Sequence, residues 1–533
     1  ILNNGIRPSF NSNDTRIFFQ SSEAGKKALK SMDLNGGNIR THYTSTYVNA
    51  FSLSPDGKWI AFTELFNVYI TPFATTGMAL DLSSNNKSLP LTKVSKDAGT
   101  YIHWSKDSKR LNWTLGPKYF SKDINSSFSF IAGTDKTAKS DSLGLDIDLR
   151  LKSDLPEGKI AITNARIITM KGDEVIENGT IVIDQNKIAA IGADVSIPEG
   201  ARVINASGKT IMPGIIDVHS HLRASSDGVS PQQDWSYYAN LAFGVTTSHD
   251  PSANTEMVFS QADMVRTGAM VGPRVYSTGT ILYGADGDFK TVVNSLDDAR
   301  SALRRMKAVG AFSVKSYNQP RRDQRQQIIQ AARELQLEVV PEGGSTFFHN
   351  LTHIQDGHSS LEHNIPQVPL FKDVKALWNK STTSYTPTLI VSYGSQSGEN
   401  YWYDRTNVWE NERLLSYTPR YIIDSRSRRR TTSEFADYGH IKVARAAKEL
   451  SDGGTKINLG AHGQLQGLGA HWELWMFAQG GMSSLQAIRS ATLNGAEHLG
   501  MAKEIGSLET GKLADMLILD ANPLDDIRNT EKI

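Results

Sequence analysis

Residues 213–504 contain eight short apolar runs with the alternation typical of β-strands, and stretches with helical periodicity lie between them. Two of those stretches, residues 296–309 and 321–335, carry apolar side chains at helical spacing. Eight strand–helix units in succession predict a (β/α)8 TIM barrel, an α/β fold whose functional side chains lie at the carboxyl ends of the strands. The eight runs are residues 213–222, 245–250, 274–279, 311–317, 337–344, 359–364, 384–390 and 455–462.

Polar side chains follow the runs where this fold would place a site. The first run ends in His-x-His, and side chains two apart on a strand point to the same side. Two neutral imidazoles converging on one point can hold a metal ion, although two unrelated histidines are the alternative. The residues at the run ends are His219 and His221 (first), Lys315 (fourth), Glu342 (fifth), His363 (sixth) and His462 (eighth).

The composition restricts what could bind there. The 533 residues include no cysteine, so a metal could be held only by His, Asp, Glu or a modified Lys. Lys plus Arg number 57 and Asp plus Glu 56, so no net charge favours nucleic acid or an anionic membrane. No apolar run approaches the length of a membrane span. We expect no nucleic-acid partner and no membrane span.

Six motifs in residues 158–533 resemble the amidohydrolase superfamily, in particular its imidazolonepropionase-like and Xaa-Pro-dipeptidase-like branch. The resemblance implies a metal-dependent hydrolase of carbon-nitrogen bonds in which metal-activated water attacks an amide, cyclic amide or dipeptide-like substrate. It also implies one or two divalent ions, most often zinc. The motifs are PGIIDVHSH (213–221), GVTTSHD (244–250), LEH (361–363), YTPT (385–388), ATLNGAEHLG (491–500) and GSLETGKLAD (506–515).

Two positions depart from that family pattern. Glu342 stands where the family commonly has His, and His462 stands where it normally has an Asp that binds metal and accepts a proton. A neutral imidazole could take over either task, so we expect His462 to act as base or ligand. The alternative is a catalytically degenerate barrel that serves as a binding or scaffolding protein. A deaminase on the same barrel is a third reading.

The expected metal ligands are His219 and His221 for one ion, with Glu342 and His363 completing a neighbouring position. Lys315 would be catalytic and would bridge two ions if carboxylated, as the motif Ser-Val-Lys-Ser-Tyr resembles. An unmodified Lys315 would instead form an ion pair with Glu342.

Other side chains would support the ligands or contact the substrate. His249 and Asp250 would orient the metal ligands, unless they only cap a strand end. Tyr317 and Arg321 follow the fourth run, where an arginine could bind a carboxylate, although a solvated helix start is the alternative. Tyr393 begins an aromatic-rich insert that would be a lid or a packed loop.

The N-terminal region contains three similar segments, each with an Asp in a turn before a new strand. The aspartates are Asp14, Asp56 and Asp107, at the spacing of a propeller blade. The segments resemble TolB-like, WD40-like repeats, and three coincidental hairpins are the alternative. We therefore expect a partial β-propeller over residues 1–155, a composite β-sandwich from 156–212 and 505–533, and the barrel over 213–504.

Several expectations concern the whole protein. The chain begins with Ile1 and ends where a further closing strand is expected, so we expect residues beyond both ends. A lack of cysteine is compatible with an oxidising space, and the resemblance points to a periplasmic or secreted protein. We expect a small-molecule amide or peptide-like substrate, a protein partner for the propeller, and a homo-oligomer.

Overall fold

The computed structural model describes residues 5–10, 12–128, 143–147, 149–223, 228–287 and 289–533. The chain folds into two compact units. One comprises residues 1–150 with 283–310, and the other comprises 151–282 with 311–533. Within the described ranges, no helix has the length and apolar character needed to cross a membrane.

The described residues of the N-terminal unit form three sheets. Their strands pair antiparallel, except that β8 pairs in parallel with β4 in the first sheet. The first sheet has β1 (Ile6–Phe10), β2 (Arg16–Glu23), β3 (Lys26–Asp33), β4 (Arg40–Ser45) and β8 (Leu80–Asp81). The second has β5 (Val48–Leu53), β6 (Trp59–Glu64), β7 (Asn67–Pro72) and β9 (Thr92–Lys93). The third has β10 (Thr100–Trp104), β11 (Arg110–Leu115), β12 (Lys118–Asp123) and β13 (Leu145–Asp146).

The repeated aspartates lie in the turns of these sheets. Asp56, between β5 and β6, accepts hydrogen bonds from the Ser54 hydroxyl (2.6 Å) and the Lys58 N–H (3.1 Å). Asp107, between β10 and β11, makes the same pair of bonds to Ser105 and Lys109. The two segments therefore share one turn structure. The sheets do not confirm a propeller, which stays a prediction.

Helix α3 (Leu296–Ala308) belongs to the N-terminal unit, although the sequence places it among the barrel helices. Asp97 binds it through Arg304 (2.6 Å) and the Ser301 hydroxyl (2.9 Å). The guanidinium of Arg305, which is buried, lies 3.4 Å from the centre of the Phe66 ring. These contacts join residues more than 200 positions apart in the chain. Helical periodicity alone does not reveal such contacts.

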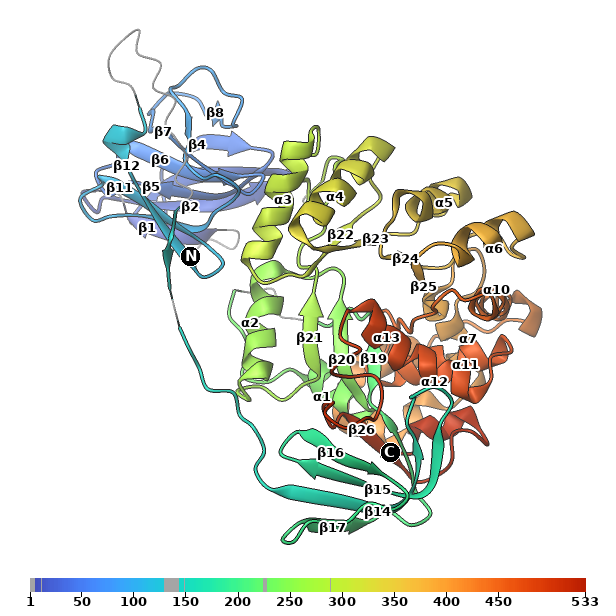
Figure 1. Ribbon diagram of the computed structural model, residues 1–533. Helices are drawn as coiled ribbons and strands as arrows, with labels where there is room; N and C mark the ends of the chain where they lie inside the picture. Colours follow the sequence, from blue (N-terminus) through green and yellow to red (C-terminus); the bar gives the residue numbers. More distant parts are fainter. Residues whose placement is uncertain (1–4, 11, 129–142, 148, 224–227, 288) are drawn as a thin grey trace. The chain divides into compact units, whose positions relative to one another are not determined.

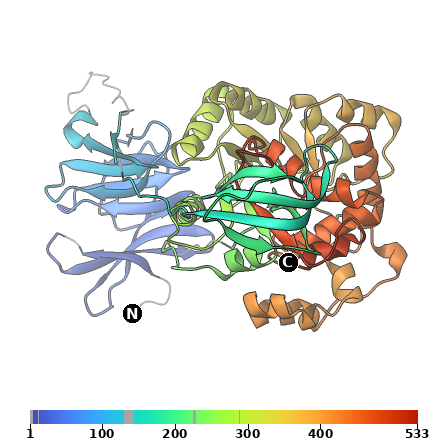
Figure 2. The same cartoon turned by 60° about the horizontal axis from the view of Figure 1, so that its bottom comes forward.

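A six-stranded sheet in the second unit combines two distant segments. It contains β14 (Lys159–Ile168), β15 (Val175–Asp184), β16 (Lys187–Gly192), β17 (Arg202–Asn205), β18 (Thr210–Pro213) and β26 (Met516–Leu519). Strand β26 pairs antiparallel with β18, and Ile211 lies opposite Ile518. Figure 2 shows the long teal strands of this sheet side by side. Ile162, Ile167, Ile181 and Leu508 fill its core.

Short parallel strands carry the other part of this unit. They are β19 (Ile215–Asp217), β20 (Val245–Asp250) and β21 (Arg274–Ser277), then β22 (Ser313–Ser316) with β23 (Glu338–Pro341), and β24 (Ser360–Glu362) with β25 (Ser384–Thr386). Backbone hydrogen bonds from Asn458 to Tyr385 and from Val218 to Leu459 place residues 457–459 between β25 and β19. Parallel strands alternating with helices confirm a mixed α/β architecture (Figure 1).

Helices separate these strands along the chain. They are α1 (Trp235–Ala242), α2 (Thr255–Arg266), α4 (Arg322–Leu335), α5 (Phe347–Asp356), α6 (Lys372–Asn379), α10 (His440–Asp452), α11 (Leu468–Gln479), α12 (Ser484–Ser490) and α13 (Leu493–His498). An insert after β25 adds α7 (Gly398–Arg405), α8 (Glu412–Tyr417) and α9 (Arg420–Ser427). Helix α11 is buried over nearly its whole length, which explains its largely apolar sequence.

Candidate metal centre

Four imidazoles from three parts of the second unit meet at the ends of its parallel strands. His219 and His221 follow β19, His363 follows β24, and His462 ends the 455–462 segment. Nitrogen atoms of His219, His363 and His462 lie within 4.8 Å of one another. The ring of His221 lies 4.6 Å from that of His462, centre to centre. The structure therefore brings together side chains that the sequence separates by more than 240 positions.

Three non-glycine residues at or beside this cluster have a left-handed backbone, as do residues elsewhere in the chain such as Asn164 and Gln336. His363 (φ +66°), Thr388 (φ +45°) and His462 (φ +57°) are left-handed without being glycine. Such residues cost about 1–3 kcal/mol each and concentrate at functional sites. A Cβ on Gly460 would lie 2.7 Å from the Cβ of His219, so glycine there permits the close approach of the 455–462 segment.

Each imidazole is held through its Nδ1 atom by a side-chain oxygen. The Nδ1 atoms of His219 and His363 lie 2.5 Å from Glu362 and 2.9 Å from Thr388, respectively. For His221 the partner is Asp250 (3.4 Å), and for His462 it is Gln464 (3.2 Å).

The Nε2 atom is the one left for another partner, and for His363 that partner is Glu342 at 3.2 Å. The Nε2 atom of His219 is buried and has no hydrogen-bond partner among the described residues. Metal-binding histidines in proteins show this arrangement, because the partner at one nitrogen fixes the lone pair on the other.

Lys315 and Glu342 form a buried ion pair beside the cluster. The Lys315 Nζ lies 2.6 Å from one Glu342 oxygen, and the other oxygen lies 3.2 Å from His363 Nε2. Burial alone would raise the pKa of Glu342, but the Lys315 ammonium and the contact with His363 outweigh it and hold the pKa well below its usual range. Glu342 is therefore a carboxylate directed at the imidazoles, and Lys315 forms the pair expected of an unmodified lysine.

Burial keeps the imidazoles of His219, His363 and His462 neutral. It lowers the pKa values of His219 and His363, and with the neighbouring imidazoles it lowers that of His462 to about 3. A neutral imidazole is the form that binds a metal ion. A group with so low a pKa is a weak base near pH 7.

Two carboxyl groups that the sequence analysis did not identify support the cluster. Asp217 accepts the backbone N–H groups of His219 and Ala461 (3.1 Å each), and Glu362 accepts from the Ser360 hydroxyl as well as contacting His219. Burial raises the pKa of each to about 7. Both lie inside the quoted motifs: Asp217 shares the side of His219 by strand alternation, and Glu362 precedes His363.

The two residues expected to orient the ligands have different surroundings. Asp250 contacts His221 and also accepts the Leu222 N–H at 2.9 Å. His249 is buried, and its ring contacts the Val218 carbonyl (3.2 Å) and the Ser313 hydroxyl (2.8 Å). Asp250 therefore lies at the cluster, whereas His249 links β20 to its neighbours.

Of the expected substrate-contacting residues, the structure brings Tyr393 to the cluster. Its ring stacks on that of His363 at 5.2 Å, and its backbone N–H binds Asn364. Tyr317 lies near enough to contribute, after burial and Glu342, to the raised pKa of Tyr393. Arg321 begins helix α4 and its largely exposed side chain pairs with Asp323 (3.1 Å), as in the alternative of a solvated helix start.

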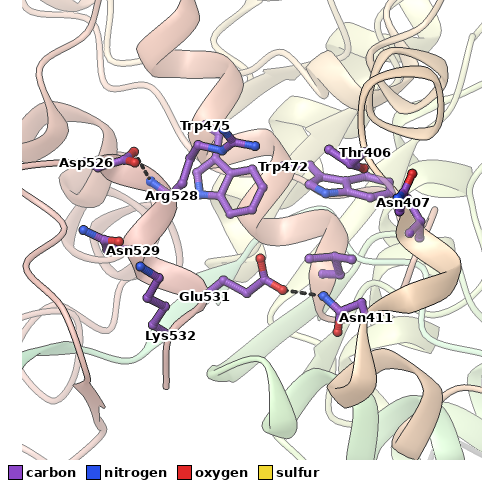
Figure 3. Close-up of a pocket in the computed structure, with 12 residues that line it drawn as sticks. Thr406, Asn407, Asn411, Trp472, Trp475, Asp526, Arg528, Asn529, Glu531 and Lys532 are labelled. Atoms are coloured by element: carbon purple, nitrogen blue, oxygen red, sulfur yellow. Dashed lines mark hydrogen bonds between the residues drawn. The ribbon is translucent and has the colours of Figure 1, made fainter.

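A cavity of about 390 Å³ lies in the second unit, but none of its lining residues belongs to the imidazole cluster. Figure 3 shows Trp472 and Trp475 of α11 facing polar side chains, among them Arg528 and Glu531. The cavity is lined by Thr406, Asn407, Val408, Asn411, Leu468, Trp472, Trp475, Asp526, Arg528, Asn529, Glu531 and Lys532. The imidazole cluster therefore lies apart from this cavity.

Comparison with known proteins agrees with the chemistry of the cluster. Residues 431–532 match the Amidohydrolase family. The ochratoxinase of Aspergillus niger is 22% identical over 449 residues, covering 74% of this chain and 89% of that protein. The imidazolonepropionase of Vibrio cholerae is 38% identical over 65 residues, covering 11% of this chain and 16% of that protein.

Solved structures resemble the fold. A crystal structure of a Xaa-Pro dipeptidase, with methionine in its active site, has a TM-score of 0.54 and 21% identity. The match covers 70% of this chain and 97% of that one.

Proposed function

We propose that this chain is an amidohydrolase that hydrolyses amide bonds with a divalent cation held by His219, His363 and His462. The family match over residues 431–532 and the hydrolase relatives support this proposal. His221 and Glu342 lie beside these three and would complete the site. Zinc suits such a set of nitrogen and oxygen ligands. In this proposal, the parallel strands form the (β/α)8 barrel whose carboxyl ends carry the site.

The tethering of all four imidazoles through Nδ1 supports this proposal most strongly. The four Nδ1 atoms have oxygen partners from different residues, and nitrogen atoms of three of the rings, His219, His363 and His462, lie within 4.8 Å of one another. The buried, unpartnered Nε2 of His219 would cost roughly 1–3 kcal/mol in a purely structural role. Binding to a cation removes that cost, so the residues present fit a metal ion.

When bound, the cation would act as a Lewis acid and would lower the pKa of a water molecule to about 7. The chain supplies the rest of the chemistry. Glu342 stays ionised, so its carboxylate can bind the cation or accept a proton. Lys315 holds that carboxylate in place. A carboxylated Lys315 bridging two ions is the alternative, and the number of ions per chain distinguishes the two.

The substrate would be an amide, a cyclic amide or a dipeptide-like molecule. A dipeptidase among the similar structures makes peptide-like amides the first class to test. Tyr393, about 39% exposed, would border the substrate, because its ring covers one face of His363. Its hydroxyl could donate a hydrogen bond to the substrate carbonyl.

The test is hydrolysis of Xaa-Pro dipeptides, N-acyl amino acids and lactams by the purified chain, with metal content measured alongside. We expect one class to be cleaved, activity to disappear after treatment with 1,10-phenanthroline, and zinc to restore it. About one ion per chain would favour the unmodified Lys315. Full turnover by protein shown to be free of metal would overturn the proposal.

A further inference from the structure

The inserted helices α7 and α9 contact the metal centre through a chain of hydrogen bonds that ends at His462. Gln464 lies between His462 and Glu399 of α7. Its amide nitrogen donates to Glu399 Oε2 at 2.6 Å, and its amide oxygen lies 3.2 Å from His462 Nδ1. Arg426 of α9 donates both to Glu399 Oε1 and to the Gln464 backbone carbonyl.

The direction of each bond follows from its donors and acceptors. A guanidinium can only donate, so the Glu399 oxygen beside Arg426 must accept. Burial raises the pKa of Glu399, and the charge of Arg426 limits that rise. The ion pair with Arg426 favours the carboxylate form of Glu399, which offers no proton, so Gln464 directs its NH2 group at Glu399 and its oxygen at His462. An amide oxygen can only accept, so His462 must carry its proton on Nδ1.

We propose that Glu399, held by Arg426, is a positioning residue that acts through Gln464 to keep the lone pair of His462 on Nε2, facing the metal centre. Without this chain of bonds, either ring nitrogen of His462 could carry the proton. A tautomer protonated on Nε2 has no lone pair for the cation. The insert would therefore be part of the catalytic machinery although none of its helices touches the cluster of nitrogens directly.

This inference rests on the proposed function only for the claim that the lone pair binds a metal ion. The tautomer itself can be measured without metal or substrate. The measurement is long-range ¹H–¹⁵N NMR of metal-free protein labelled with ¹⁵N-histidine, with the His462 signal identified by its loss in His462→Asn. We expect the wild type to show His462 protonated on Nδ1 alone. A His462 signal protonated on Nε2 in the wild type would overturn the inference.

Three variants separate positioning from folding. Glu399→Leu should give a mixture of tautomers and weaken zinc binding about 10- to 100-fold. The exchange Glu399→Gln with Gln464→Glu keeps a donor opposite every acceptor, so it should restore the single tautomer. Asp424→Asn is the matched control on α9, because Asp424 pairs with Arg420 and Arg428 and not with Gln464. It should change neither the tautomer nor the affinity.

If Glu399→Leu does not fold, Gln464→Met provides the same test, because it removes the acceptor and leaves the backbone carbonyl that binds Arg426. Wild-type tautomer and affinity in a folded Glu399→Leu or Gln464→Met protein would refute the role of Glu399. A single tautomer in the wild type that becomes mixed in Glu399→Leu, with no zinc binding by either protein, would instead refute the metal centre and leave the positioning intact.

Discussion

The turn aspartates of the N-terminal unit and the imidazole cluster of the second unit place their polar side chains in opposite surroundings. In the N-terminal unit, Asp56 and Asp107 lie in surface turns and bond to residues two positions away. In the second unit, His219, Asp217 and Glu362 are fully or almost fully buried and bond to partners from other strands. Of the 13 histidines, His42 and His103 belong to the first unit and the other 11 to the second.

The difference shows where function can reside. The carboxylate of a turn aspartate accepts hydrogen bonds from neighbouring residues in the chain, so its role is to stabilise the hairpin and not to bind a ligand. A buried imidazole needs a partner at each nitrogen, and at the cluster the Nε2 atom of His219 has no partner among the described residues. Comparing variants in the N-terminal unit with variants in the second unit therefore tests whether the site lies in the second unit.

The largest effect is expected from His219→Asn. Loss of the buried Nε2 should reduce hydrolysis by about 10³-fold, because a bound cation supplies several kcal/mol of transition-state stabilisation. The measurement is kcat/KM together with the metal content. Asp56→Ala in the N-terminal unit is the control and should keep wild-type activity. Equal losses in both variants would contradict the division between the units.

Glu473→Ala should be the most destabilising change. Glu473 on α11 is fully buried, and its carboxyl accepts the Leu389 N–H (2.8 Å) and the Ile390 N–H (2.9 Å) next to Thr388. Leaving two buried donors unpaired should lower the free energy of unfolding by about 2–5 kcal/mol. Urea unfolding measures this loss. Glu473→Gln keeps one acceptor, so a loss as large as that of alanine would argue against the hydrogen bonds as its cause.

Acidification should weaken the second unit through its buried histidines. Burial lowers the pKa of His498 from 6.5 to about 4. Between pH 6.5 and pH 4, His498 is therefore protonated in the unfolded chain but not in the folded protein. Stability from this residue is complete above pH 6.5 and is lost as the pH falls toward 4. Between pH 7.5 and 4.5, the wild type should lose about 2–3 kcal/mol of unfolding free energy more than His498→Leu. Parallel pH profiles for the two proteins would contradict this linkage.

The smallest effect is expected from Asp56→Ala on stability. The variant removes the acceptor for Ser54 and Lys58 in one surface turn, at a cost of about 1 kcal/mol. Thermal unfolding of the full chain measures it. A loss as large as that of Glu473→Ala would mean that the turn supports more than its own hairpin.

Much of the second unit could be predicted because its signals are local. Strand alternation placed His219 and His221 on one side of a run, and the run ends located Lys315, Glu342, His363 and His462, all of which lie at the cluster or beside it. The contact of Asp250 with His221 could be predicted for the same reason, because both residues lie at the ends of predicted strands.

The rest depends on contacts between distant residues. Nothing near Glu473 in the sequence indicates that it binds the backbone beside Thr388, and nothing near Arg426 indicates a connection to His462. His353 of α5 and His358 are both buried and their rings lie 4.5 Å apart. Such burial follows from packing between elements, which periodicity within one element does not reveal.

Anomalous diffraction at the zinc edge, from crystals grown with one equivalent of zinc, tests the central claim most directly. The account predicts a peak shared by the Nε2 atoms of His219, His363 and His462, with Glu342 beside it, and no peak in the N-terminal unit. Zinc bound only elsewhere, with those three nitrogens unoccupied, would contradict it.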